Sequence, residues 1–186
     1  MFGFPILIVY SSLKGDAWHI ASYTIYGVTL ILLYFASTFY HGCKTLHSKK
    51  HLRVVDHACI YLLIAGSYTP FTLGPLRETS GWILLTIEWS IAVVGILFKI
   101  FAIDRLKTFS LITYLLMGWL VVVSWSTLME TLSTSTLVLV GIGGLCYTLG
   151  SIFFVWENLR FNHGIWHLFV LGGSGCHYCA ILFLLA

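Results

Sequence analysis

Three histidines carry the clearest potential for chemistry in this chain. His41 ends one apolar stretch, and His163 and His167 stand four residues apart at the start of the last one. A lone histidine at a membrane boundary is more often an interfacial polar residue, but zinc binds neutral imidazole, and three protein ligands leave a fourth position open. The spacing therefore predicts a zinc site with an open position, which favours an enzyme.

Two further polar side chains lie where they could serve such a site. Ser37 is one helical turn before His41, on the same face of its helix. Asp56 begins the next apolar stretch, where a carboxylate can orient a ligand or accept a proton from water. We predict catalytic roles for Asp56 and Ser37. The alternatives are helix packing for Ser37, and for Asp56 an ion pair with Arg53 or a helix-capping position.

Membrane-spanning helices must position these residues. Hydrophobic residues make up 59% of the 186-residue chain, charged residues make up 9%, and the mean hydropathy is +0.93. Continuous apolar runs of about 20 residues cross a bilayer as helices, whereas a membrane barrel needs alternating segments. The sequence predicts an all-α integral membrane protein, a multi-pass protein of the cell membrane with one domain over residues 1–186.

The apolar runs predict a seven-transmembrane helix bundle. The stretch from Phe2 to Leu13 is apolar but too short to span, so we interpret it as the outer part of a first helix. Clusters of charged residues, Gly or Pro bound the other runs. These six spans are predicted at residues 17–42, 54–75, 81–102, 107–129, 134–156 and 163–185.

The basic residues predict the orientation of the helices. Eight of the ten Lys and Arg residues, Arg105 among them, lie in or beside the loops after the second, fourth and sixth spans. Lys and Arg prefer cytoplasmic loops, so these loops and the N-terminus are predicted to be cytoplasmic. His41, Asp56 and His163 then share the cytoplasmic boundary of the membrane.

Five segments of the sequence form a recognisable set of motifs. They are Ser-Thr-Phe-Tyr-His (37–41), Leu-Arg-Val-Val-Asp-His (52–57), Ile-Ala-Gly-Ser-Tyr-Thr-Pro-Phe (64–71), Met-Gly-Trp (117–119) and His-Gly-Ile-Trp-His-Leu-Phe-Val-Leu (163–171). With these motifs the chain resembles the hemolysin III family, part of the wider group of progestin and adiponectin receptors. The resemblance covers nearly all of the chain, and the motifs are specific as a set.

The resemblance carries expectations for the fold and the site. It implies a seven-helix bundle with its N-terminus inside and with zinc held by His41, His163 and His167. Asp56 matches an aspartate that contacts the zinc water in the receptor relatives, and Ser37 matches the serine of the first motif. Family members usually begin with an additional acidic segment and a complete first helix, so we expect the first helix to be truncated here.

Three classes of function follow from these expectations. The leading hypothesis is a zinc-dependent hydrolase that cleaves a lipid amide or ester at the cytoplasmic leaflet, with membrane lipid as environment and substrate. Analogy with the receptor relatives suggests a ceramide-type amide. The alternative is a receptor or regulator of lipid or membrane-energy homeostasis with a structural zinc. A cytolysin or pore is less favoured, because the spans show no continuous polar stripe. No nucleic-acid partner is expected.

Several other polar residues are secondary candidates. Glu88 lies within a span, where an acid is costly enough to suggest a function. His177 lies roughly 15 Å beyond His167 along a helix, too far to bind the same zinc. His47 and His51, in the basic loop, are expected to contact anionic lipid. Packing or interfacial roles are predicted for His57, Cys176 and Cys179.

Overall fold

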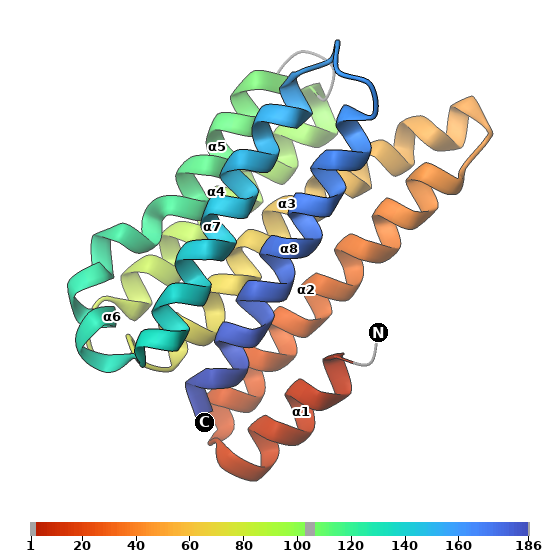
Figure 1. The fold of residues 1–186 in the computed structure, drawn as a ribbon. Helices are drawn as coiled ribbons and strands as arrows, with labels where there is room; N and C mark the ends of the chain where they lie inside the picture. The colour runs from red at the N-terminus through yellow and green to blue at the C-terminus, as the bar shows by residue number, and fades with distance from the viewer. Residues whose placement is uncertain (1–2, 103–106, 186) are drawn as a thin grey trace. The chain divides into compact units, whose positions relative to one another are not determined.

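The structure, a computed structural model that describes residues 3–102 and 107–185, is helical almost throughout (Figure 1). Arg105, one of the cations behind the predicted orientation, lies outside the described residues. No strand occurs in the described part of the chain, so the prediction of an all-α protein is confirmed. In order, the helices are α1 (Gly3–Lys14), α2 (Ala17–Gly42), α3 (Leu46–Leu73), α4 (Gly81–Ala102), α5 (Lys107–Trp119), the 3₁₀ helix η1 (Leu120–Ser124), α6 (Trp125–Thr131), α7 (Thr134–Val155), α8 (Asn162–Leu182) and η2 (Phe183–Leu185).

Five helical segments are long and apolar enough to cross a membrane. They are Ala17–Gly42, Gly81–Phe101, Thr108–Thr131, Thr134–Val155 and Asn162–Leu185. Two of the predicted helices are not among them. The 12 residues of α1 extend only about 18 Å, and the first half of α3 carries several charges. The multi-pass helical architecture is confirmed, while the orientation in the membrane stays a prediction.

Contacts between Cα atoms divide the chain into two compact units, Met1–Leu120 and Val121–Ala186. The first unit is organised around α3, which packs against α2, α4 and α5, while α1 packs against α2. Figure 1 shows α2 and α3 as a long antiparallel hairpin. Tyr61 and Ala65 of α3 form a buried cluster with Ala92 of α4 and Met117 of α5. The prediction of one domain over residues 1–186 stays a prediction.

The third helix begins earlier than the hydropathy pattern predicts. We expected a loop up to residue 53, but α3 starts at Leu46 and includes Lys49, Lys50 and Arg53. Hydropathy marks where a helix becomes apolar, whereas helix formation depends on local propensity. Leu, Lys and Arg are good helix formers, and no Gly or Pro interrupts this segment. The basic residues therefore lie on the first turns of a helix.

The helix that follows α4 changes its geometry at Leu120. Here α5 passes into η1, whose Leu-Val-Val-Val-Ser sequence is rich in β-branched residues that disfavour the α conformation. The hydroxyl of Tyr68, on α3, lies 2.8 Å from the carbonyl oxygen of Met117 and 3.0 Å from that of Gly118. It can donate to carbonyls near the end of α5 and stabilise the transition to the tighter helix.

The second unit is built on the antiparallel pair α7 and α8. Rings from each helix fit against glycines of the other, because a Cβ at Gly143 would lie 2.3 Å from the His177 ring and one at Gly173 2.8 Å from the Tyr147 ring. A hydrogen bond of 2.9 Å joins the hydroxyls of Tyr147 and Ser174. Small residues and hydroxyl bonds are the usual means by which membrane helices approach closely.

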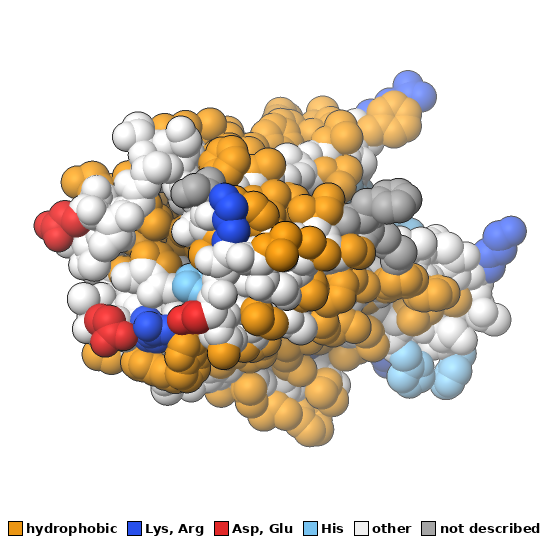
Figure 2. All heavy atoms as spheres, turned by 90° about the horizontal axis from the view of Figure 1, so that it is seen from below, with side chains coloured by type: hydrophobic (Ala, Val, Ile, Leu, Met, Phe, Trp, Pro, Cys, Tyr) orange, Lys and Arg blue, Asp and Glu red, His pale blue; other side chains and the backbone are white. Residues whose placement is uncertain are grey.

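The surface agrees with burial in lipid. Figure 2 shows a face on which hydrophobic side chains cover most of the area and charged side chains are sparse. Leu46, Phe101 and Val123 are exposed by 87%, 83% and 74% of their surface. Soluble monomers rarely expose so much contiguous apolar surface. Together with the five long apolar helices, this surface identifies a multi-pass membrane protein.

Candidate metal centre

The strongest local arrangement of possible ligands is the histidine pair at the start of α8. His163 and His167 lie one turn apart, and their Nε2 atoms are 3.1 Å from each other. The ring centroids are 4.6 Å apart with the planes at 86°. Two nitrogens each about 2.0–2.1 Å from a tetrahedral zinc are separated by about 3.3–3.4 Å. The pair therefore fits a shared ion with a small adjustment, and it also fits a hydrogen bond between the rings.

The residue before α8 has a backbone conformation that is unusual for its type. Phe161, the N-cap residue, has φ 64° and ψ 17°, the left-handed region that bulky side chains seldom adopt. The Arg160 guanidinium lies 4.8 Å from the Phe161 ring centroid. This local strain occurs two residues before His163, and strained backbone is frequent near functional sites. The chain thus enters α8 through a sharp turn that begins just before the first histidine of the pair.

His41 lies in the last turn of α2, where its side chain is exposed and its ring packs against Tyr40 with centroids 4.7 Å apart. The helix ends cleanly at Cys43, whose N–H donates to the carbonyl of Phe39 at 3.0 Å. His41 belongs to the first unit, whereas His163 and His167 belong to the second. Zinc binding by all three residues stays a prediction.

Ser37 and Asp56 come together in the first unit. The antiparallel packing of α2 on α3 brings the Ser37 hydroxyl close to the Asp56 carboxyl, where it is placed to act as a donor. Asp56 is buried, with 8% of its surface exposed. Because Ser37 is one turn before His41, this buried acid lies beside the helix end that carries the histidine. The arrangement suits a carboxylate that accepts and returns a proton.

Sequence reasoning missed two neighbours of Asp56. We predicted only a packing or interfacial role for His57, but its Nδ1 lies 3.6 Å from the Asp56 carboxylate. Tyr114, on α5, donates a hydrogen bond of 2.9 Å to the His57 carbonyl. The Asp-His dipeptide was a visible signal for the first contact, because flexible side chains can bridge 100° around a helix. The Tyr114 contact joins residues 57 positions apart, and no local pattern could reveal it.

Other candidates occupy separate positions. His177 lies 3.4 Å from the Val140 carbonyl oxygen and stacks edge-on with Tyr147, which indicates packing between α7 and α8. Cys176 and Cys179 are free thiols. His47 and His51 form a second exposed i, i+4 pair on the basic first turns of α3, with ring centroids 4.9 Å apart.

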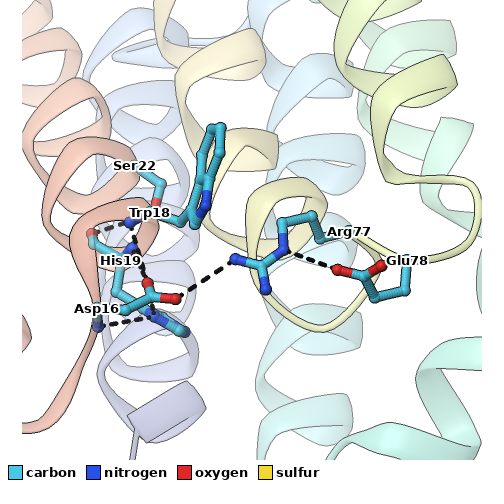
Figure 3. A network of polar contacts seen from close by, with 6 residues as sticks. All are labelled: Asp16, Trp18, His19, Ser22, Arg77 and Glu78. Atoms are coloured by element: carbon cyan, nitrogen blue, oxygen red, sulfur yellow. Dashed lines mark hydrogen bonds and ion pairs between the residues drawn. The ribbon is translucent and has the colours of Figure 1, made fainter.

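A different polar network lies at the N-terminal end of α2, opposite to the end that carries His41 (Figure 3). Asp16 is the N-cap of α2 and accepts hydrogen bonds of 3.0 Å from the backbone N–H groups of Trp18 and His19. The His19 ring lies 2.7 Å from the same carboxylate, and Arg77, from the α3–α4 connection, lies 3.4 Å from its other oxygen. The hydrogen bond from the His19 backbone, aided by the His19 side chain and Arg77, lowers the pKa of Asp16 to about 2.

Comparison with known proteins places the chain in a family. The family model described as haemolysin-III related matches residues 1–178. The chain is 46% identical to a Hemolysin-3 homolog of Bacillus subtilis over 95% of this chain and 83% of that protein. It is 47% identical to Hemolysin-3 of Bacillus cereus, over 96% and 81%.

The similarity extends to an animal protein. The chain is 35% identical to the human monocyte to macrophage differentiation factor over 91% of this chain and 72% of that protein. No solved structure matches the chain. The resemblance seen in the motifs is thus confirmed along almost the whole length, and the chain belongs to the haemolysin-III-related family of membrane proteins.

Proposed function

We propose that this protein is a zinc-dependent hydrolase that cleaves an amide or ester bond of a membrane lipid at the cytoplasmic leaflet. His41, His163 and His167 would each give one imidazole nitrogen to the metal. The observation that carries the proposal is the 3.1 Å separation of the His163 and His167 Nε2 atoms, which suits two ligands of one ion. Neutral nitrogen donors favour zinc over calcium or magnesium, which prefer oxygen ligands.

Asp56 is the general base in this proposal. Bound zinc supplies a Lewis acid for the lipid carbonyl and makes a nearby water more acidic. Asp56 takes a proton as the water oxygen bonds to the carbonyl carbon, and it returns that proton to the leaving nitrogen or oxygen when the acyl bond breaks. Ser37, whose hydroxyl lies close to the Asp56 carboxylate, would donate a hydrogen bond that holds this carboxylate in position. The products are a fatty acid and the amine or alcohol of the lipid.

The lipid substrate follows from the surroundings of these residues. The surface of the helices is apolar and accepts acyl chains from the bilayer. The N-terminal turns of α3 carry Lys49, Lys50 and Arg53, which attract anionic headgroups. A receptor or regulator would use the same histidines for a structural metal without turnover. The name of the Bacillus cereus relative suggests lysis by that protein, but no observation on this chain favours a pore.

The test combines metal analysis with lipid turnover by the detergent-purified protein. We expect about one zinc per chain and release of fatty acid from a fluorescent ceramide or from a diacyl lipid ester. Chelation should stop the release, and added zinc should restore it. The Asp56→Asn variant should keep its zinc and lose turnover. Full zinc occupancy without turnover of either lipid class would contradict the hydrolase and favour the receptor or regulator.

A further inference from the structure

A buried acid, Glu88, lies in the membrane-spanning part of the first unit. Glu88 is on α4, which has a single buried stripe that includes Leu84, Glu88, Ala92 and Lys99. Glu88 has no exposed surface, and neither of its carboxyl oxygens has a hydrogen-bond partner among the described residues. A fully enclosed acid without a partner is rare in proteins, and in a membrane span it indicates a function.

The residues next to Glu88 on α4 pack against uncharged groups of the neighbouring helices. Ala92, one turn further along the stripe, packs against Tyr61 and Ala65 of α3 and Met117 of α5. Trp89, the next residue after Glu88, donates a hydrogen bond of 3.2 Å to the Thr69 hydroxyl. This contact aligns the turn of Glu88 with the C-terminal part of α3. The interhelical contacts of these two neighbours of Glu88 are therefore made by apolar, aromatic and hydroxyl groups.

The charged groups of the neighbouring helices lie several turns away. Lys99 is eleven residues along α4, about 16 Å from Glu88 at 1.5 Å per residue, and its Nζ lies over the Tyr114 ring at 5.9 Å. Asp56 and Arg53 are 13 and 16 residues before Thr69 on α3, or about 20 Å and 24 Å along that helix.

The other titratable groups on the buried faces of α3 and α5 include tyrosines. Tyr61 and Tyr68 lie on α3, and Tyr114 lies on α5. Tyrosine hydroxyls are uncharged at neutral pH, so they cannot balance an ionised carboxylate. An ionised acid in such surroundings loses its hydration without a compensating ion pair, whereas the protonated acid is neutral.

We propose that Glu88 is a proton-binding site in the membrane interior, occupied by a proton at neutral pH. The ligand is the proton itself, held on one carboxyl oxygen. Glu88 is about 20 Å from the level of Asp56 along α3. It is therefore separate from the proposed catalytic acid, and this proposal does not depend on zinc or on lipid turnover.

Infrared spectroscopy of the whole protein in lipid tests the proposal directly. A protonated carboxylic acid has a C=O stretching band that a carboxylate lacks. We expect this band at pH 7 in the wild type and its loss in Glu88→Gln, where the amide has nearly the shape of the protonated acid. The matched control is Glu78→Gln, because Glu78 is exposed and paired with Arg77 at 3.1 Å. That variant should keep the band.

Isotope labelling provides a second measurement that needs no variant. Of the four glutamates, Glu78, Glu130 and Glu157 are exposed and only Glu88 is buried. Wild-type protein made with glutamate labelled by ¹³C at the side-chain carboxyl should therefore shift this band at pH 7, whereas labelled aspartate should not. A spectrum at pH 7 without a protonated glutamate band would overturn the proposal.

Discussion

The two ends of the α2–α3 pair use an aspartate in opposite ways. At one end, Asp16 is exposed, caps a helix and binds backbone N–H groups, an imidazole and a guanidinium. At the other end, Asp56 is buried and contacts a serine hydroxyl and the His57 ring. The Asp16 carboxylate stabilises the start of α2 and its contact with the α3–α4 connection. The second caps no helix, and in the proposed function it exchanges a proton as the general base.

The largest expected effect is the loss of metal when the α8 histidines are removed. His163→Ala and His167→Ala should each reduce zinc from about one per chain to a small fraction, because loss of one of three ligands opens the site. Inductively coupled plasma mass spectrometry measures the content. The control is His47→Ala, since His47 and His51 are also an exposed i, i+4 pair. Equal zinc loss in the control would show that pairing on a helix, rather than the predicted site, binds the metal.

The comparison of the two acids predicts a selective loss of turnover. Asp56→Asn should lower kcat for lipid hydrolysis by about 10²–10⁴-fold, the usual contribution of a general base, with zinc content unchanged. Asp16→Asn should leave kcat nearly as it is. Steady-state kinetics on the same lipid measures both variants. If Asp16→Asn lowered kcat as much as Asp56→Asn, the assignment of the general base to Asp56 alone would be contradicted.

The opposite selectivity is expected for stability. Asp16→Ala removes the N-cap of α2, and loss of such a cap costs about 1 kcal/mol, with a range of about 0.5–2. The melting temperature in detergent should therefore fall, while zinc content stays the same. Thermal unfolding followed by circular dichroism measures the change. Ser12→Ala is a suitable control, because Ser12 is an exposed residue near the same end whose hydroxyl bonds only within α1 at 2.8 Å.

The pKa of Asp16 predicts how this end responds to acid. The pKa is about 2 in the folded protein and about 3.9 in an unfolded chain. A lowered folded pKa means that the ionised form stabilises the fold at every pH above about 3.9, and that this contribution is lost as the pH falls towards 2. The stability difference between wild type and Asp16→Asn should be constant near neutral pH and shrink below about 3.9. A constant difference down to pH 2 would contradict a stabilising role of the ionised Asp16 carboxylate.

The smallest expected effect concerns the turn before α8. Phe161→Gly should relieve a left-handed backbone that costs a residue with a side chain about 1–2 kcal/mol, partly offset by the flexibility of glycine in the unfolded chain. We expect a slight rise in melting temperature, whereas Phe161→Val should lower it. A marked fall for the glycine variant would show that the exposed Phe161 ring contributes packing that outweighs the strain.

The sequence predicted the helices well because their signal is local. Runs of about 20 apolar residues locate the spans from α2 onward to within a few residues, and the exception is the polar start of α3 at Leu46. The closeness of Ser37 and Asp56 also followed from the sequence, since both stand at the same end of antiparallel helices. The strained Phe161 and the Tyr114 bond to His57 depend on tertiary packing and gave no sequence pattern.

Glu88 shows the same limit in the membrane interior. Its presence in a span was visible in the sequence, but the lack of a hydrogen-bond partner among the described residues became apparent only when α3, α4 and α5 were packed. His163 and His167 are the converse case, because the four-residue spacing alone places both on one helical face. A pattern within one helix can be read from sequence, whereas a partner on another helix requires the fold.

Zinc-edge X-ray absorption of the purified wild-type protein tests the central claim most directly. We predict a four-coordinate zinc with three imidazole nitrogens and one oxygen at about 2.0–2.1 Å, and one imidazole fewer in His41→Ala wherever that variant retains metal. A spectrum dominated by sulfur at about 2.3 Å, or one unchanged in the His41, His163 and His167 variants, would contradict the account.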